Sequence, residues 1–144
     1  MATGQIKDPY GSFRFSVEID GIVRAAFKEV SGLESDVEVK DYREGGENTT
    51  VRKLPGLTKY ANIQLKWGMA DDPDLYDWHQ DVIRGDFERK NGSIVLFNQK
   101  GDEVARWNFV RAWPTKWNGP ALNAESSDIA IDTLELVHEG LARA

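Results

Sequence analysis

The stretch that decides the fold is 52-RKLPGLTKYANIQLKWG-68. From Ile63 onward its residues alternate between apolar and polar, which is the pattern of a strand with one buried face and one polar face. Ahead of this strand, Pro55-Gly56 predicts a type II turn, because proline fixes its own φ and glycine supplies the positive φ that the third position needs. We therefore expect a turn followed by a half-buried strand.

A polar excursion leads into that stretch. Residues 42-YREGGENTTV-51 contain nothing apolar enough to anchor them to the core of their own subunit. Segments of this composition often become ordered only against a partner. We expect an extended arm over residues 42–57 that is ordered by something outside the subunit.

Length and composition set the class of protein. The 144 residues fit a single domain spanning 1–144, and the formal net charge of −6 argues against a nucleic-acid binder with a basic surface. The absence of cysteine excludes disulfides and thiolate metal sites. The first residues lack a signal-peptide pattern, and no apolar run is long enough to span a membrane. We expect a protein made and kept in the cytoplasm, with no membrane insertion.

Strands are also predicted before the opening stretch. Residues 12–20 alternate cleanly, and Asp20-Gly21 is a hairpin signal after which Ile22–Val30 can return as the second strand. Residues 34–43 form a weaker strand. Its valines, Val37 and Val39, share one face, and charged residues occupy the other.

One helix is predicted, at residues 73–84. Asp72 is a natural N-cap, Pro73 suits the first helical position, and Gly85 suits the C-terminal end. The apolar stripe of this helix consists of Leu75, Trp78, His79, Val82 and Ile83. We expect this stripe to dock on a sheet.

Three further strands follow the helix. They are residues 93–98, 103–113 and 127–138, and the last has apolar residues on both faces, which predicts that it is covered on both sides. Residues 113-WPTKWNGP-120 should not form a regular central strand, because prolines bracket them. Seven or eight strands and one helix predict a mainly β fold, an antiparallel sandwich or barrel with one flanking helix.

Residues that could carry catalysis are scarce. His79 and His138 have no metal-ligand spacing, no serine lies in a nucleophile elbow, and Gly45-Gly46 is not followed by the lysine of a phosphate loop. We expect no enzyme activity, no metal and no cofactor. Among the tryptophans, Trp113 and Trp117 do not fall on a predicted core face and could fill a subunit interface.

The motifs taken in order resemble a known family. The matching fragments are DPY (8–10) with Phe13 and Phe15, FKEVSGL (27–33), YREGGEN (42–48), LPG (54–56) with KY (59–60), LKWG (65–68), Trp78, RKNG (89–92), WP (113–114) and DTLELVHEGL (132–141). Together they resemble the inner-tube proteins of contractile phage tails and phage-derived contractile injection systems, the Hcp-like tube proteins. Each fragment is weak alone, and it is their order over nearly the whole chain that is specific.

The resemblance implies a tube-protein fold of two antiparallel sheets with one flanking helix. It implies a homohexameric ring that stacks into a hollow tube inside a contractile sheath, and this tube delivers cargo through a target envelope. The implied partners are the chain itself, the sheath protein, baseplate or spike proteins, tube-terminating proteins, and a luminal cargo of protein effector or DNA. Assembly would take place in the cytoplasm of the producing cell, as part of a phage tail or a phage tail-like particle that can be released.

The resemblance also suggests which residues do what. The residues assigned to contacts between subunits and stacked rings are Tyr42, Arg43, Glu44, Gly45, Gly46, Glu47, Asn48, Leu54, Pro55 and Gly56. The residues expected to face the lumen are Asp36, Glu38, Lys40, Asn62, Gln64 and Lys66. If the excess carboxylate lines the lumen, the wall would repel anionic cargo such as DNA. The negative charge could equally lie on the outside.

Two alternatives remain open at this point. One is a relative of the same family that starts the tube at the baseplate or caps it. The other belongs to a different class, a monomeric barrel that binds a small molecule in a pocket lined by tryptophan, or an enzyme built on such a barrel. Fold alone does not decide between them.

Overall fold

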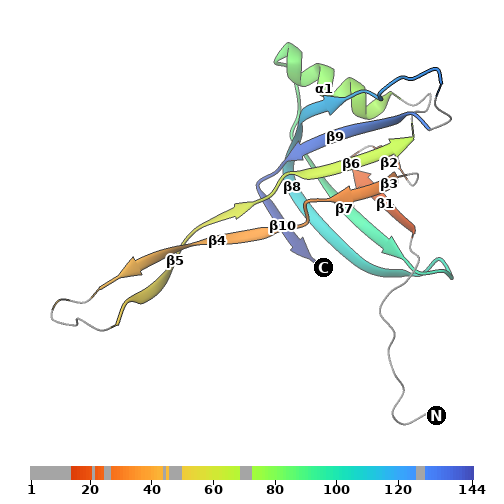
Figure 1. Ribbon diagram of the computed structural model, residues 1–144. Helices are drawn as coiled ribbons and strands as arrows, with labels where there is room; N and C mark the ends of the chain where they lie inside the picture. Colours follow the sequence, from red (N-terminus) through yellow and green to blue (C-terminus); the bar gives the residue numbers. More distant parts are fainter. Residues whose placement is uncertain are drawn as a thin grey trace, which may run out of the picture.

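The computed structural model describes residues 14–20, 22–24, 27–43, 45, 50–68, 73–125 and 129–144. Its elements are β1 (Arg14–Ile19), β2 (Ile22–Arg24), β3 (Phe27–Ser31), β4 (Ser35–Tyr42), β5 (Arg52–Tyr60), β6 (Ile63–Gly68), α1 (Asp74–Arg84), β7 (Lys90–Phe97), β8 (Glu103–Asn118), β9 (Ile131–Val137) and β10 (Gly140–Arg143). Figure 1 shows a body with α1 at one end and a two-stranded ribbon that projects from its side. The prediction of a mainly β fold with one helix is confirmed.

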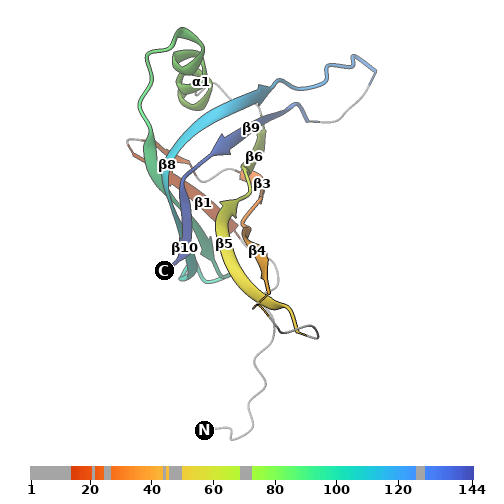
Figure 2. The same ribbon diagram turned by 90° about the vertical axis from the view of Figure 1, so that its left-hand side faces the viewer.

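Two antiparallel sheets make up the fold. Eight strands form the body in the order β2-β1-β7-β8-β9-β6-β3, with β10 also paired to β8, and β4 and β5 form the ribbon. The long strand β8 curves across the body (Figure 2), pairing with β7 and β10 through its first part and with β9 through its second. The body is therefore a sandwich whose halves share β8, and it does not close into a barrel.

The alternation of apolar and polar residues along the strands explains which side chains form the core. In β6, Ile63, Leu65 and Trp67 are buried while the residues between them are half-exposed, as the opening stretch predicts. These side chains form one cluster with Val17 and Ile94 of the other half of the sandwich. Burying each large apolar side chain stabilises the fold by roughly 1.5–3 kcal/mol, so this cluster holds the two halves together.

The strand predicted at 103–113 runs on to Asn118, but residues 113–118 are not a regular central strand, as predicted: among the described strands they pair only with β9 and with a register shift. The strand runs through Pro114, which pairs with Leu136 of β9 beside a register shift. Proline is tolerated here because this part of β8 pairs only with β9, so its missing N–H removes no bond from a second neighbour. The strand bends at Arg111, whose φ of 51° is left-handed, and the side-chain oxygen of Asn91 accepts its backbone N–H at 3.0 Å.

The helix is close to its predicted position. It begins at Asp74 with Pro73 as N-cap, and it ends at Gly85, whose φ of 80° is left-handed. Asp72, the predicted N-cap, lies outside the described residues. Of the predicted stripe, Leu75 and Trp78 are buried, His79 and Val82 are partly buried, and Ile83 is 65% exposed, so the stripe is narrower than expected.

Two strand predictions need correction. Ile22–Val30 is not one returning strand, because β2 pairs with β1 while β3 pairs with β6, where Phe27 packs edge-on against Trp67. The strand predicted at 127–138 is β9, which begins at Ile131. Its Leu134 and Leu136 are buried on one face, and Ile131 and Val137 on the other face are half-buried. The short β10 was not predicted.

Candidate assembly surfaces

β4 and β5 form a two-stranded ribbon, and this ribbon is longer than the extended arm predicted over residues 42–57. β4 and β5 pair with each other from Ser35 opposite Tyr60 to Tyr42 opposite Arg52, and with no other described strand. The predicted type II turn is wrong, because Pro55 and Gly56 lie inside β5. Proline fits because the outer edge of β5 is unpaired, so no ladder bond is lost. An added Cβ on Gly56 would lie 3.1 Å from the Glu38 carbonyl oxygen, which explains glycine there.

The ribbon carries exposed apolar side chains. Val39 is 62% exposed and Leu57 69%, and three more large apolar residues of the ribbon are also exposed, namely Val37, Tyr42 and Leu54. The register places Val37 and Val39 on one face of the ribbon, and Leu54 on the other face opposite Lys40. Five exposed large apolar side chains on one two-stranded element indicate an interaction site in a folded protein.

The tip of the ribbon is only partly described. Arg43 and Gly45 are exposed, and Lys53 donates a hydrogen bond of 2.6 Å to Asp41 just below the tip. The assigned arm residues Glu44, Gly46, Glu47 and Asn48 lie outside the described residues.

The six residues expected to face the lumen lie on two separate elements. Asp36, Glu38 and Lys40 belong to the ribbon strand β4 and are exposed. Asn62 immediately precedes β6, while Gln64 and Lys66 lie on the half-exposed face of β6 in the body. The structure therefore does not bring the six together on one face.

The β6 residues belong to a wider surface, which we call the polar face. The strand register gives it two rows across β3, β6, β9 and β8, namely Glu29–Lys66–Thr133–Asn118 and Ser31–Gln64–Glu135–Lys116. Lys66 pairs with Glu29 at 3.1 Å, and Gln64 donates to Glu135 at 3.4 Å. Two lysines and two glutamates make it neutral in sum. Sequence reasoning found only the β6 members, because the rows depend on pairing between distant strands.

The two tryptophans predicted for an interface pack within their own subunit. Trp113 lies 5.6 Å from the ring of Phe87, and Trp117 lies 4.9 Å from Tyr76 of α1 in an edge-on arrangement. Both are partly buried against the core cluster. These ring contacts attach α1 and the segment after it to β8.

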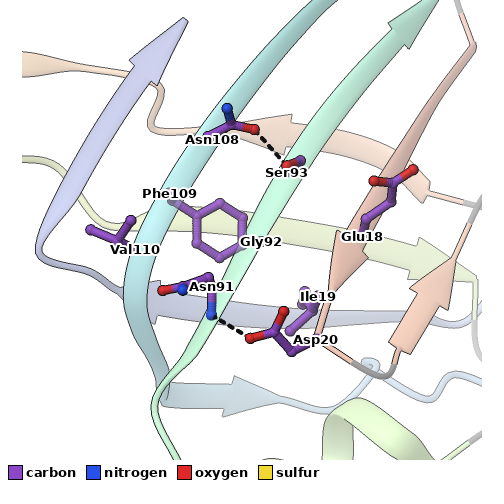
Figure 3. A pocket seen from close by; sticks show the side chains of 9 residues that line it. All are labelled: Glu18, Ile19, Asp20, Asn91, Gly92, Ser93, Asn108, Phe109 and Val110. Carbon is purple, nitrogen blue, oxygen red and sulfur yellow. Dashed lines mark hydrogen bonds between the residues drawn. The ribbon is translucent and has the colours of Figure 1, made fainter. Parts of the chain in front are cut away.

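A cavity of about 310 Å³ lies on β1, β7 and β8 (Figure 3), where the sticks show Asp20 and Asn91 on one side of the Phe109 ring and Ser93 and Asn108 on the other. The Ser93 hydroxyl donates to Asn108 at 2.6 Å, and the Asn91 backbone N–H donates to Asp20 at 3.2 Å. The members of each pair are hydrogen-bonded to each other, and neither pair places a nucleophile beside a general base. Within the described ranges, no three potential ligands gather to hold a metal ion.

Beside this cavity lies a charged network. Arg106 donates to Glu103 at 2.8 Å and to Glu18 at 3.0 Å. The hydrogen bond from Arg106 lowers the pKa of Glu103, and the bonds to Glu103 and then Glu18 raise the pKa of Arg106. Both shifts favour the charged forms of Glu103 and Arg106, so the network is structural. No described helix is long and apolar enough to cross a membrane.

Solved structures of similar chains share this fold. A chain of the PVC sheath–tube complex of an extracellular contractile injection system, in the extended state, is 29% identical with a TM-score of 0.85, covering 96% of this chain and 93% of the other. A chain of the cap of the anti-feeding prophage, the AFP tube terminating cap, is 26% identical with a TM-score of 0.87, covering 99% and 95%. Hcp1 from Flavobacterium johnsoniae, at 17% identity, a TM-score of 0.62 and coverage of 90% and 94%, shares the fold. A search of curated proteins finds no match.

The chain therefore has the fold of the tube proteins. The family model of the T4-like virus tail tube protein gp19 matches residues 11–142, and the chain belongs to this family. It is a tail tube protein of the kind found in contractile phage tails and contractile injection systems, which confirms the resemblance seen in the sequence.

Proposed function

We propose that this chain forms homohexameric rings that stack into a hollow tube inside a contractile sheath. The observation that carries the proposal is the ribbon, whose paired strands hold five large apolar side chains in solvent, away from any core. A ring that closes head to tail uses two different surfaces of each subunit. The ribbon is one of them, and its exposed apolar side chains dock on a neighbouring subunit or ring.

The polar face would line the lumen. Among the described residues it carries no exposed large apolar side chain, whereas the ribbon carries five. A surface that binds another protein buries its exposed apolar side chains in the contact. A surface that faces water in the assembly is expected to carry no such side chains. Because its four charges balance, this wall would attract neither anionic nor cationic cargo strongly. The acidic lining first considered rested on Asp36 and Glu38, which lie on the ribbon.

The remaining parts of the proposal follow from the family. The chain has no catalytic role, requires no cofactor, and assembles in the cytoplasm of the producing cell. Its partners are further copies of itself, a sheath protein, baseplate or spike proteins and a tube-terminating protein, and the tube delivers a protein effector or DNA. The sheath, tube and cap named for the similar structures support these partners.

A leucine exchange tests the assembly role of the ribbon. Burying a whole leucine contributes roughly 1.5–3 kcal/mol, so Leu57, which is 69% exposed, should contribute about 1–2 kcal/mol to each contact it makes. Leu57→Ser should raise the concentration needed for assembly by about 5- to 30-fold. Leu122→Ser, at 84% exposure outside the ribbon, is the matched control. Sizing and negative-stain microscopy over a concentration series would measure both variants, and equal assembly of the two would refute the role of the ribbon.

Single cysteines test the lumen assignment, since the chain has none of its own. Thr133→Cys lies on the polar face and Asp77→Cys on the exposed surface of α1. In assembled tubes both should react with a small maleimide. Only Asp77→Cys should react with a maleimide coupled to a large globular protein. Reaction of Thr133→Cys with the large reagent in intact tubes would remove the polar face from the lumen.

A further inference from the structure

The ribbon joins the body through two short legs. The first leg is Gly32–Glu34, between β3 and β4, and the second is Ala61–Asn62, between β5 and β6. The Ala61 N–H donates to the Glu34 carbonyl oxygen at 3.3 Å. An added Cβ on Gly32 would lie only 2.0 Å from the Asn62 carbonyl oxygen, so the legs are in close contact.

Beyond these legs the ribbon is held mainly by its own pairing. β4 and β5 pack closely on each other, and neither packs along a described strand of the body or along α1. Figure 1 shows the ribbon leaving the body without lying against it. The direction in which it leaves is therefore set at the legs.

One side chain of the body contacts the second leg. His138, between β9 and β10, places Nε2 2.9 Å from the Ala61 carbonyl oxygen and Nδ1 3.1 Å from the Gly140 carbonyl oxygen. Its ring also lies 5.5 Å from the ring of Tyr60, the last residue of β5, and 6.4 Å from that of the buried Phe109. A single half-buried imidazole thus contacts the leg, the end of the ribbon, the β9–β10 connection and the core.

We propose that His138 is a positioning residue that fixes the direction in which the ribbon leaves the body. A hydrogen on Nε2 donates to Ala61, and the contact with Phe109 ties that hydrogen bond to the rigid core. Without the imidazole, the Ala61 carbonyl loses this donor and Tyr60 loses its ring partner, so the ribbon would sample a range of directions. The consequence for ring assembly rests on the proposed function, whereas the effect on ribbon direction does not.

Distance measurements on the unassembled subunit test the proposal directly. Spin labels on Lys40→Cys in the ribbon and Asp77→Cys in α1 give a ribbon-to-body distance, and excess unlabelled chain suppresses distances between subunits. His138→Phe keeps a ring but removes both nitrogens. His138→Gln keeps a donor at about the Nε2 position, and His138→Asn is too short to bring its amide there.

The wild type and His138→Gln should give one narrow distance distribution. In His138→Phe and His138→Asn the ratio of that distance to all other distances should fall about five-fold, the change in an equilibrium constant that loss of one ordinary hydrogen bond produces. Cooperative thermal unfolding would establish that each variant is folded, and His138→Asn serves if His138→Phe is not. A broad distribution in the wild type, or an unchanged one in both variants without the Nε2 donor, would overturn the proposal.

Assembly gives the second readout. His138→Gln should form tubes at nearly the wild-type concentration, and His138→Phe should need several-fold more protein. Absence of tubes from the wild type would refute the proposed function while leaving the distance result to decide the role of His138. Equal assembly of the two variants, with a difference in ribbon direction, would refute the link between direction and assembly.

Discussion

Replacing Gly92 by alanine should destabilise the subunit. Gly92 lies in the middle of β7, between Ile19 of β1 and Phe109 of β8. A Cβ at this position would lie 2.4 Å from Phe109 Cζ and 2.6 Å from the Glu18 carbonyl oxygen, about 1 Å inside the 3.4 Å at which ordinary contact begins. The Phe109 ring is fully buried and the carbonyl belongs to a paired strand, so neither can retreat freely.

The size of the effect follows from that crowding. Overpacking a core typically costs about 1–3 kcal/mol, and a smaller gain of about 0.4–1 kcal/mol from the stiffer unfolded chain offsets part of it. The melting temperature should therefore fall by roughly 3–8 °C. The control is Gly68→Ala in β6, where the nearest atom to an added Cβ is an Ile129 methyl carbon at the ordinary distance of 3.7 Å. This control should leave stability unchanged or slightly raised.

Urea unfolding of five chains would decide the matter: the wild type, Gly92→Ala, Gly68→Ala, Phe109→Leu, and Gly92→Ala combined with Phe109→Leu. Leucine removes the atom nearest the new methyl group, so the double variant should be more stable than the sum of its single changes predicts. If Gly92→Ala is as stable as Gly68→Ala, the close approach of Phe109 does not constrain this strand and the reasoning fails.

Three further outcomes are expected. Gly32→Ala should destabilise the subunit by more than about 1 kcal/mol, because its φ of 89° is left-handed and its methyl group would meet a backbone carbonyl; an unchanged urea midpoint would contradict this. At the bend of β8, Arg111→Val should be about 1–2 kcal/mol less stable than Arg111→Asn, because a β-branched residue is strained at positive φ, and thermal unfolding compares the pair. The hydrogen bond from Arg106 lowers the pKa of Glu103, so the charged form of Glu103 stabilises the fold at neutral pH. That contribution is lost as the pH falls through the lowered pKa. Glu103→Gln should therefore be less stable than the wild type at neutral pH and equally stable well below pH 4.5.

Local patterns predicted the elements whose stability depends on one buried face. The alternation in β6 and the stop signal at Gly85 are local properties, and the structure has both where they were expected. The predicted stripe of α1 included Ile83, which is 65% exposed.

Proline was misread at Pro55, and at Pro114 it suggested too early an end to the strand. Both residues lie within strands, although the sequence suggested a turn at Pro55 and a strand that stops at Trp113. A proline excludes a strand only where its missing N–H would be needed by a neighbour. Whether a strand has one neighbour or two is a property of the whole sheet, which no local window contains. The same limit hid the polar face, since β6 reveals its neighbours Glu29 and Glu135 only through pairing.

The continuity of the ribbon with the body has a mechanical consequence. Its second leg leads directly into β6, which is bonded along its length to β3 on one side and to β9 on the other. Antiparallel ladder bonds lie perpendicular to their strands, so a pull along β6 loads all of them at once, in shear. Peeling an edge strand would instead break its bonds one after another. A ribbon rooted in this interior strand can therefore transmit tension into the subunit without unravelling it.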